Sequence, residues 1–242
     1  MTRLLLYSTI YLAGILFLLT GCDSDRFDCV RGNGVLTNEQ TELDEPFVAV
    51  YSQGSFEIFI TPGESGTVRI EAEENIHSKI NVEVENNTLI IGSKNGHCIN
   101  ESKSVKIYVT TKSLEAINNS GSGRMEASGF ESDHFNAKMS GSGEIELELV
   151  VDELKADLHG SGEMTLEGTT RKSNIEVSGS GSVKAGDLIQ QICFIDMYGS
   201  GEAFVNVAQL LDVEVSGSGK VYYRGGASVE SRISGSGSVI RY

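Results

Sequence analysis

Four acidic residues recur at nearly equal spacing in the C-terminal half of the chain, and they are the first candidates for chemistry. The near-constant interval between them is expected of side chains stacked on neighbouring turns of a repeat. At a strand separation of ~4.8 Å, two carboxylates repel by about 0.9 kcal/mol even in bulk water. Calcium takes oxygen ligands and would relieve this repulsion, so the run is a candidate calcium site. Its members are Asp157, Glu176, Asp196 and Glu214.

The same carboxylates have two other interpretations. Enzymes that cleave polysaccharides also use paired carboxylates. However, repeats this short leave no long loop to wall a cleft, and neither His134 nor His159 has a clear nucleophile as partner. We therefore expect a solvated acidic face with no catalytic residues and no cofactor. Calcium binding is the second interpretation and catalysis the third.

A three-residue motif, Gly-Ser-Gly, sets this spacing. It occurs seven times at a nearly constant interval. A fixed period is typical of repeat architectures. Glycine adopts backbone angles closed to other residues, so the chain can turn sharply at the same place in every repeat. The copies begin at Gly121, Gly141, Gly160, Gly179, Gly199, Gly217 and Gly235.

The residues around each motif alternate between apolar and polar. An alternation with period 2 predicts strands with one buried face, and stacked repeats would align the apolar columns into one core. Each repeat then consists of a strand, a glycine corner, a second strand and a polar return loop. The apolar column two positions after the motif contains Met125, Ile145, Met164, Val183, Ala203, Val221 and Val239.

The sequence therefore predicts an all-β protein. We expect 113–242 to form a single-stranded, right-handed parallel β-helix, or β-solenoid. Each rung would hold about 18–20 residues, at the short end of the range for such repeats.

The chain begins with a pattern typical of secretion. Arg3 precedes an apolar run over 4–19, and Leu19-Thr20-Gly21-Cys22 resembles a bacterial lipobox. A transmembrane segment is the alternative, but sixteen residues are few for a span. We expect 1–21 to be a lipoprotein signal peptide and 22–45 to hold the lipidated Cys22 and a polar tether. The predicted location is the cell envelope, as an outer-membrane lipoprotein facing the periplasm or the surface.

Residues 46–112 alternate without the glycine motif and form a predicted N-terminal β segment. Pro62 and the pair Asn86-Asn87 mark turns between its strands. The first rung of a solenoid exposes unpaired backbone, so this segment is expected to cap it. The predicted strands are 47–51, 55–60, 67–71, 79–85, 88–91 and 105–110.

Three cysteines remain after Cys22. Cys193 lies in an inward column and is predicted to be a core thiol. Cys29 and Cys98 both lie in the N-terminal part, where secretion permits a disulfide between them. His97 beside Cys98 gives poor zinc spacing, since no second ligand pair accompanies it. The net charge of −15 makes nucleic acid an unsuitable partner.

One outward column changes character toward the C-terminus. Charged and polar residues in the third position after the motif give way to Phe204, Tyr222 and Ile240. We expect these three to form an exposed apolar strip near an uncapped last rung, suited to self-association or to a partner. The alternative is that a return loop folds over them.

Several passages between Pro46 and Tyr242 are characteristic in combination. They read Phe-Val-Ala-Val at 47–50, Phe-Glu-Ile-Phe-Ile at 56–60, Leu-Ile-Ile at 89–91, Val-Lys-Ile-Tyr-Val-Thr at 105–110, and then the recurring Ser-Gly-Ser-Gly. Together they resemble the putative auto-transporter adhesin head domain family, also called the GIN domain family. The resemblance implies a β-helical, secreted or lipid-anchored protein of gut-type Gram-negative bacteria, with no catalytic residues to carry over.

The predicted function is therefore a non-catalytic, cell-envelope lipoprotein that acts as an adhesin-like binding or display module. The expected partners are a membrane, through the lipid anchor, and a glycan or protein ligand. Two alternatives stay open at this point. One is a carbohydrate-active β-helix enzyme, and the other is a purely structural envelope protein.

Overall fold

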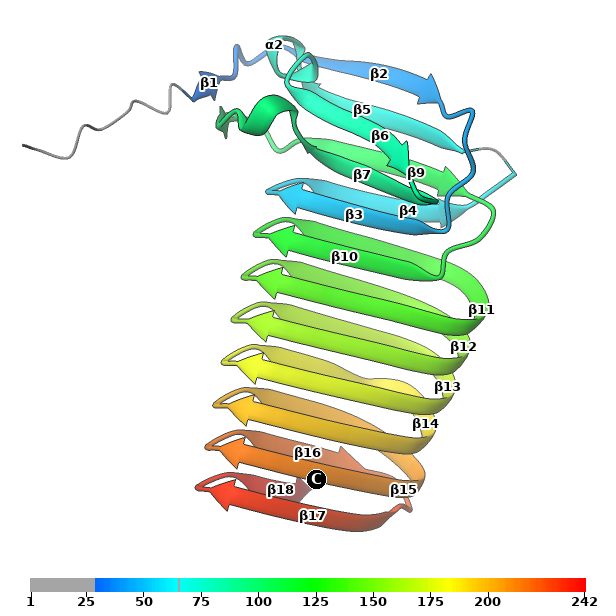
Figure 1. Cartoon of the computed structure of the whole chain (residues 1–242), viewed down its shortest axis with the longest axis vertical. Coiled ribbons are helices and arrows are strands. Elements are labelled where there is room, and N and C mark those ends of the chain that lie inside the picture. Colours follow the sequence, from blue (N-terminus) through cyan, green and yellow to red (C-terminus); the bar gives the residue numbers. More distant parts are fainter. Residues whose placement is uncertain (1–28, 65) are drawn as a thin grey trace, which may run out of the picture.

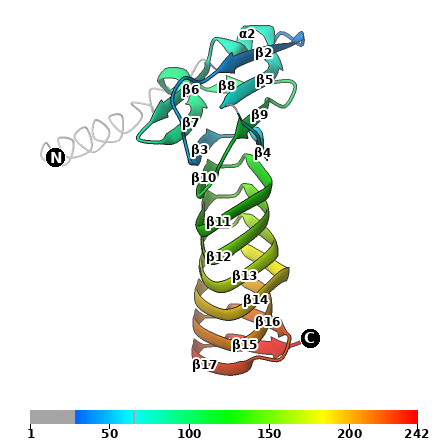
Figure 2. The same ribbon diagram turned by 90° about the vertical axis from the view of Figure 1, so that its right-hand side faces the viewer.

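In the middle of the repeat region, each strand runs from one glycine corner to the next. The computed structural model describes residues 29–64 and 66–242. In it, consecutive repeats pair in parallel and in register, so Gly141, Gly160 and Gly179 lie opposite one another on neighbouring strands. The stack forms the long axis of the molecule (Figures 1 and 2). Its strands are β10 (Ala116–Gly121), β11 (Arg124–Gly141), β12 (Glu144–Gly160), β13 (Glu163–Gly179), β14 (Ser182–Gly199), β15 (Glu202–Gly217), β16 (Lys220–Arg224), β17 (Ser228–Gly235) and β18 (Ser238–Arg241).

The prediction of polar return loops between the strands is wrong. The chain stays extended there, and β12 pairs with β13 almost residue by residue from Glu144↔Glu163 to Gly160↔Gly179. Backbone hydrogen bonds between rungs satisfy the polar groups of these segments, so they need no loop. The bends on this side fall instead at Gly129, Gly168 and Gly225, which have positive φ angles of 79°, 106° and 106°.

The first glycine of each motif is required by close backbone contact. Gly160 has φ of 120°, and a Cβ on it would overlap the carbonyl oxygen of Gly141 on the preceding rung. The serine then continues the ladder, since the N–H of Ser161 donates to that same carbonyl at 2.9 Å. An L side chain in this conformation is strained, and here it also meets main-chain atoms.

The inward columns form one continuous core. Met125, Ile145, Met164 and Val183 are fully buried, as the alternation predicts. Cys193 is also fully buried, and burial raises the pKa of its thiol to about 12. It is therefore a packed core residue, in agreement with the sequence.

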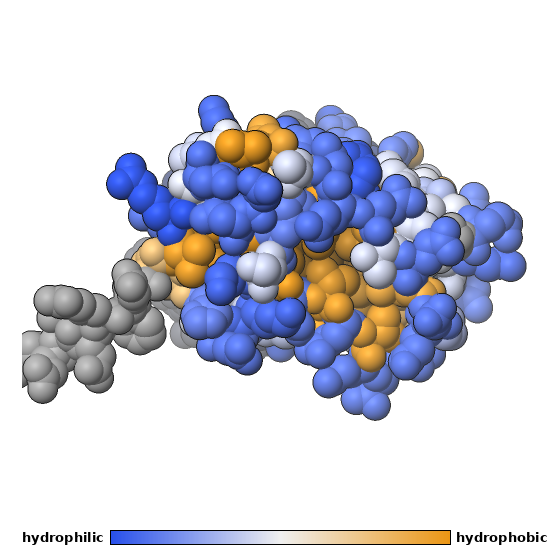
Figure 3. All heavy atoms as spheres, turned by 90° about the horizontal axis from the view of Figure 1, so that it is seen from above, coloured by the Kyte–Doolittle hydropathy of each residue, from blue (hydrophilic) through white to orange (hydrophobic). Residues whose placement is uncertain are grey.

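The N-terminal part continues both faces of the stack and then ends them. β3 (Ala49–Gly54) pairs in parallel with β10, and β4 (Glu57–Pro62) with β11. The next strands, β7 (Thr88–Ser93) and β9 (Lys106–Thr111), still pair in parallel with β3 and β4. Beyond β7 and β9 the pairing turns antiparallel, which closes the solenoid as expected of a cap. Apolar side chains remain visible at this end between polar ones (Figure 3). Two further strands of the cap are β5 (Thr67–Glu73) and β6 (Ile80–Glu85).

The predicted tether over 22–45 is too long. It contains β1 (Val30–Arg31) and β2 (Leu36–Glu42), which pairs with β5 at the edge of the cap. The other short elements are β8 (Ile99–Asn100), α2 (Glu74–His77) and the 3-10 turn η1 (Lys94–Gly96). The signal peptide predicted over 1–21 and the lipidation predicted at Cys22 lie outside the described residues.

Two contacts fix the start of the folded chain to the cap. Cys29 and Cys98 form the predicted disulfide, next to the β1–β8 pair. Glu73 is fully buried and accepts hydrogen bonds from Ser102, whose hydroxyl lowers the pKa of the carboxyl. The backbone N–H of Gly34 also donates to it. These contacts hold the first described residues of the chain to the cap.

Replacing the corner glycine Gly160 with alanine is expected to destabilise the fold by at least about 2 kcal/mol, because positive φ and backbone overlap act together. Gly226→Ala is the matched control. A Cβ there would have 3.5 Å to its nearest atom, so we expect little change. Thermal unfolding followed by circular dichroism measures both. Equal midpoints for the two variants would contradict the steric role of the corner.

Candidate functional site

The acidic run forms a ladder across four rungs. The strand register places Asp157, Glu176, Asp196 and Glu214 opposite one another in sequence order, as their spacing predicts. The ends of the ladder have cationic partners. Lys155 contacts Asp157 at 2.7 Å. At the other end the guanidinium of Arg232 lies 3.7 Å from Glu214.

The middle of the ladder is electrostatically unfavourable. Burial raises the pKa of the Asp196 carboxyl, and the neighbouring charges of Glu214 and Glu176 raise it further. Within 29–64 and 66–242, no group of three or more acidic, histidine or cysteine side chains is arranged to hold a metal ion. Calcium at the ladder stays a prediction, which titration calorimetry tests directly.

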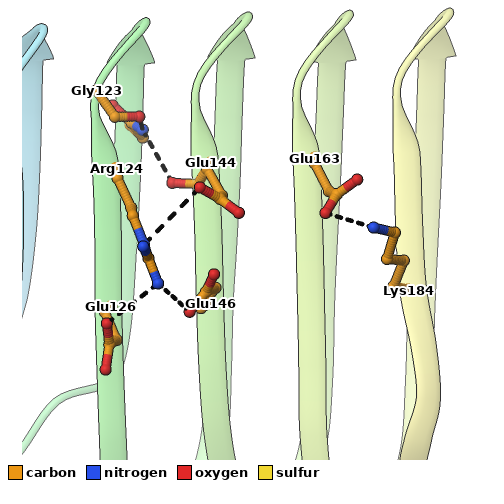
Figure 4. Close-up of polar contacts among 8 residues, drawn as sticks. Gly123, Arg124, Glu126, Glu144, Glu146, Glu163 and Lys184 are labelled. Carbon is orange, nitrogen blue, oxygen red and sulfur yellow. Dashed lines mark hydrogen bonds and ion pairs between the residues drawn. The ribbon is translucent and has the colours of Figure 1, made fainter.

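A second charged cluster lies on the other face of the rungs, just after the glycine corners. Arg124 lies among three carboxylates (Figure 4): it hydrogen-bonds Glu146 and lies 3.4 Å from Glu126 and 3.8 Å from Glu144. Burial, and then the neighbouring Glu146, raise the pKa of Glu144. Beside the cluster is an open, mainly polar hollow of 340 Å³ whose wall includes Glu126, Glu146, Glu148 and Glu167.

The predicted apolar strip is formed near the last rungs. The rings of Phe204 and Tyr222 stack with centroids 4.7 Å apart and planes 7° apart, and Ile240 follows in register. Among the described residues, no return loop covers Phe204, because the chain continues after it as strand β15. Instead, Tyr242 packs its ring edge against Phe204 at 6.3 Å. Phe204 and Tyr222 are half-buried, and Ile240 is exposed.

A mostly apolar hollow of 280 Å³ adjoins this strip at Phe204. In register, Lys184 lies next to Phe204 on the preceding rung, but its ammonium contacts Glu163 at 2.6 Å (Figure 4). The side chain of Lys184 therefore extends toward the rung before it, away from Phe204. The lining residues are Thr165, Leu166, Glu167, Lys184, Gly186, Asp187 and Phe204.

An irregularity in β14 shapes the hollow. The register between β14 and β15 breaks between Ala185 and Ile189, which moves Gly186 and Asp187 out of the ladder. Arg224 holds this segment, donating to the carbonyl of Gly186 at 2.6 Å and to Asp187 at 3.0 Å. The result is an aromatic ring with carboxylate and ammonium groups around it. Such a setting suits a small ligand that has one apolar face and several polar groups.

Comparison with known families identifies the chain. Residues 46–227 match the family described as putative auto-transporter adhesin, head GIN domain. The chain belongs to this family. The resemblance drawn from the sequence is thereby confirmed. A comparison with curated proteins found no match.

Solved structures of relatives share the fold. A putative adhesin from Bacteroides fragilis is 22% identical with a TM-score of 0.82, covering 88% of this chain and 100% of its own. A putative lipid binding protein from Parabacteroides distasonis is 25% identical with a TM-score of 0.74, and the match covers 88% of this chain and 99% of that protein. A putative adhesin from Parabacteroides merdae is 22% identical with a TM-score of 0.71, and the match covers 88% of this chain and 98% of that protein. The fold of this chain is thus shared with these solved structures. In the described part of the chain, no helix is long and apolar enough to cross a membrane.

Replacing Asp196 with asparagine is expected to stabilise the protein at neutral pH by less than about 1 kcal/mol, because solvent screens this exposed group. A carboxyl whose pKa is raised on folding costs stability while charged, and stability returns as pH falls through the folded pKa. The gain should therefore vanish below the ordinary pKa of 3.8. Urea unfolding at pH 7 and pH 3 measures it.

Asp157→Asn is the matched control on the same ladder. It removes the carboxylate that contacts Lys155, so it should not stabilise the protein at either pH. An equal gain from both variants, or a gain for Asp196→Asn that persists at pH 3, would contradict the repulsion assigned to Asp196.

Proposed function

We propose that this protein is a non-catalytic, adhesin-like module of the bacterial cell envelope, anchored by lipid at Cys22, that binds saccharide at the hollow beside Phe204. The observation that carries this is the hollow itself, whose mostly apolar wall contains the aromatic ring of Phe204 and also includes charged residues such as Lys184 and Asp187. Sugars have apolar C–H faces that pack on aromatic rings, and hydroxyls that bond carboxylates and ammonium groups.

The size of the hollow limits the ligand. A volume of 280 Å³ lies at the small end of ligand sites, so it suits one sugar residue rather than a long chain segment. Binding by one such site is expected to be weak. Many copies on one cell surface would convert weak contacts into firm attachment, because the second and later contacts form within an already tethered pair. This is the physical basis of the adhesin-like role.

The orientation of the rod supports this role. Cys22 precedes Cys29 by seven residues, and Cys29 is joined to the cap. At ~3.5 Å per residue, a connection of this length reaches at most about 25 Å. A lipid on Cys22 therefore keeps the cap close to the membrane. The residues that line the hollow belong to β13, β14 and β15, and these strands lie away from the cap, toward the opposite end of the solenoid (Figure 2).

Replacing Phe204 with alanine is expected to weaken saccharide binding about fivefold, which corresponds to the loss of one aromatic contact of roughly 1 kcal/mol. A glycan array of residues 23–242 first supplies the ligand, and titration calorimetry then gives the affinity of each variant. Tyr198→Ala is the control, since Tyr198 is an exposed aromatic on another column. Both variants should have the same thermal unfolding midpoint as the parent protein.

Three results would contradict the proposal. Unchanged affinity in Phe204→Ala would place the saccharide elsewhere. Release of cleaved product would favour the carbohydrate-active enzyme. An array without any binding by the folded protein would favour a purely structural role in the envelope.

A further inference from the structure

The last rung of the solenoid is open. β17 pairs with β15 on one side, and no strand among the described residues pairs with its other side. Its inward column continues that of β15, where Val213 and Val215 are fully buried. Ile233 occupies the same column but is 44% exposed. The open rung thus presents both apolar side chains and unpaired backbone, which is a template for another strand.

The unpaired backbone groups of β17 belong to its odd-numbered residues. In the equivalent column of an earlier rung, the N–H of Asn136 donates back to Glu115 of the preceding strand. Following the strand register from rung to rung, the residue of β17 that corresponds to Asn136 is Glu230. Backbone direction alternates along a strand, so Glu230 and Arg232 bond β15. Val229, Ser231 and Ile233 then direct their N–H and C=O groups away from the protein.

We propose that this edge pairs with the same edge of a second copy of the chain, antiparallel and with the twofold axis at Ser231. The strand sequence is self-complementary in this register. Val229 of each copy lies opposite Ile233 of the other, and Glu230 lies opposite Arg232. Both pairs occur twice, as an isologous interface requires. Opposite charges and apolar pairs at directly opposed positions each stabilise an antiparallel pair.

Other registers are less favourable. Odd-numbered residues of one copy must face odd-numbered residues of the other, because only these offer free hydrogen-bonding groups. An axis at Glu230 or Arg232 places that residue opposite its own copy, where like charges repel. An axis at Val229 or Ile233 places Glu230 and Arg232 opposite serine or glycine, so that the two charged residues no longer pair with each other.

Two further observations favour the antiparallel pair. Head-to-tail stacking onto another molecule would not continue the parallel ladder, because the cap ends in the antiparallel strands β2 and β6. Arg232 contacts Asp212 of β15 at 2.8 Å, and its side chain is still 59% exposed, so the guanidinium can also reach Glu230 of a second copy. The charge and apolar pairs along β17 therefore favour a second copy of the same edge.

The geometry of this dimer has a consequence for adhesion. The two caps lie at opposite ends of the paired rods (Figure 1 shows one rod, with cap and open rung at its two ends). With the lipid anchor of the proposed function on each cap, the dimer joins two membranes rather than two neighbours on one. The pairing itself rests only on β17 and is independent of the saccharide site.

A pair of charge variants tests the register. Glu230→Arg makes the edge wholly basic, and Arg232→Glu makes it wholly acidic. Each alone places like charges opposite one another in both pairs, so dimerisation should weaken at least tenfold. Mixed in equal amounts, the two variants regain both Glu–Arg pairs and should form a heterodimer. Sedimentation equilibrium of residues 23–242 at rising concentration measures the mass, and circular dichroism confirms that each variant is folded.

The double variant Phe204→Ser with Tyr222→Ser is the control for the apolar strip, and it should dimerise like the parent. Three results would overturn the proposal. The first is a parent protein that remains monomeric at about 0.1 mM, a concentration at which even a weak dimer forms. The second is a pair of charge variants that dimerise as well as the parent, and the third is a mixture of the two variants that stays monomeric. Loss of the dimer in the strip variant alone would also overturn it, by placing the contact at Phe204 and Tyr222.

Discussion

The whole molecule depends on how closely the backbone of one rung can approach the next at the glycine corners. At Gly160 the preceding carbonyl occupies the space of a Cβ, and the φ of 120° disfavours other residues. Every rung that turns at this point is placed directly over the one before it. The register of the strands, the continuity of the core and the alignment of outward side chains all follow from this one steric constraint.

Because the rungs are in register, a residue type repeated at the period of the chain becomes a ladder in space. The structure uses this in two ways. Where a cation lies within the ladder, as at Arg124, it offsets part of the negative charge of the carboxylates around it. At Asp196, burial and then the stacked charges of Glu214 and Glu176 raise the pKa of the carboxyl. Departures from the period are the places where a ligand can fit, and the break in β14 beside Phe204 is one example.

Much of the fold could be predicted from the sequence because the period fixes the register directly. The pairing of Asp157 with Glu176 and the stacking of Phe204 on Tyr222 both follow from counting residues between glycines. Several cap strands also lie close to their predicted bounds. β2 was missed because Leu36–Glu42 is a mostly exposed edge strand that is almost entirely polar.

The return segments were predicted as loops for the same reason, since polarity alone does not distinguish a loop from an outward strand.

The candidate site was less accessible to sequence reasoning. The hollow at Phe204 depends on a local register shift, and on Lys184 extending toward Glu163, which no periodic pattern shows. The Arg124 cluster had a usable signal. Arg124 and Glu144 occupy the same position after successive motifs, so counting residues would have placed them side by side.

The most direct test of this account is a crystal structure of residues 23–242 with the saccharide that binds most tightly. We expect an intact sugar ring packed on Phe204, with its hydroxyls within hydrogen-bond distance of Lys184 or Asp187. A saccharide bound at another place on the rod, or a cleaved product in the hollow, would contradict it.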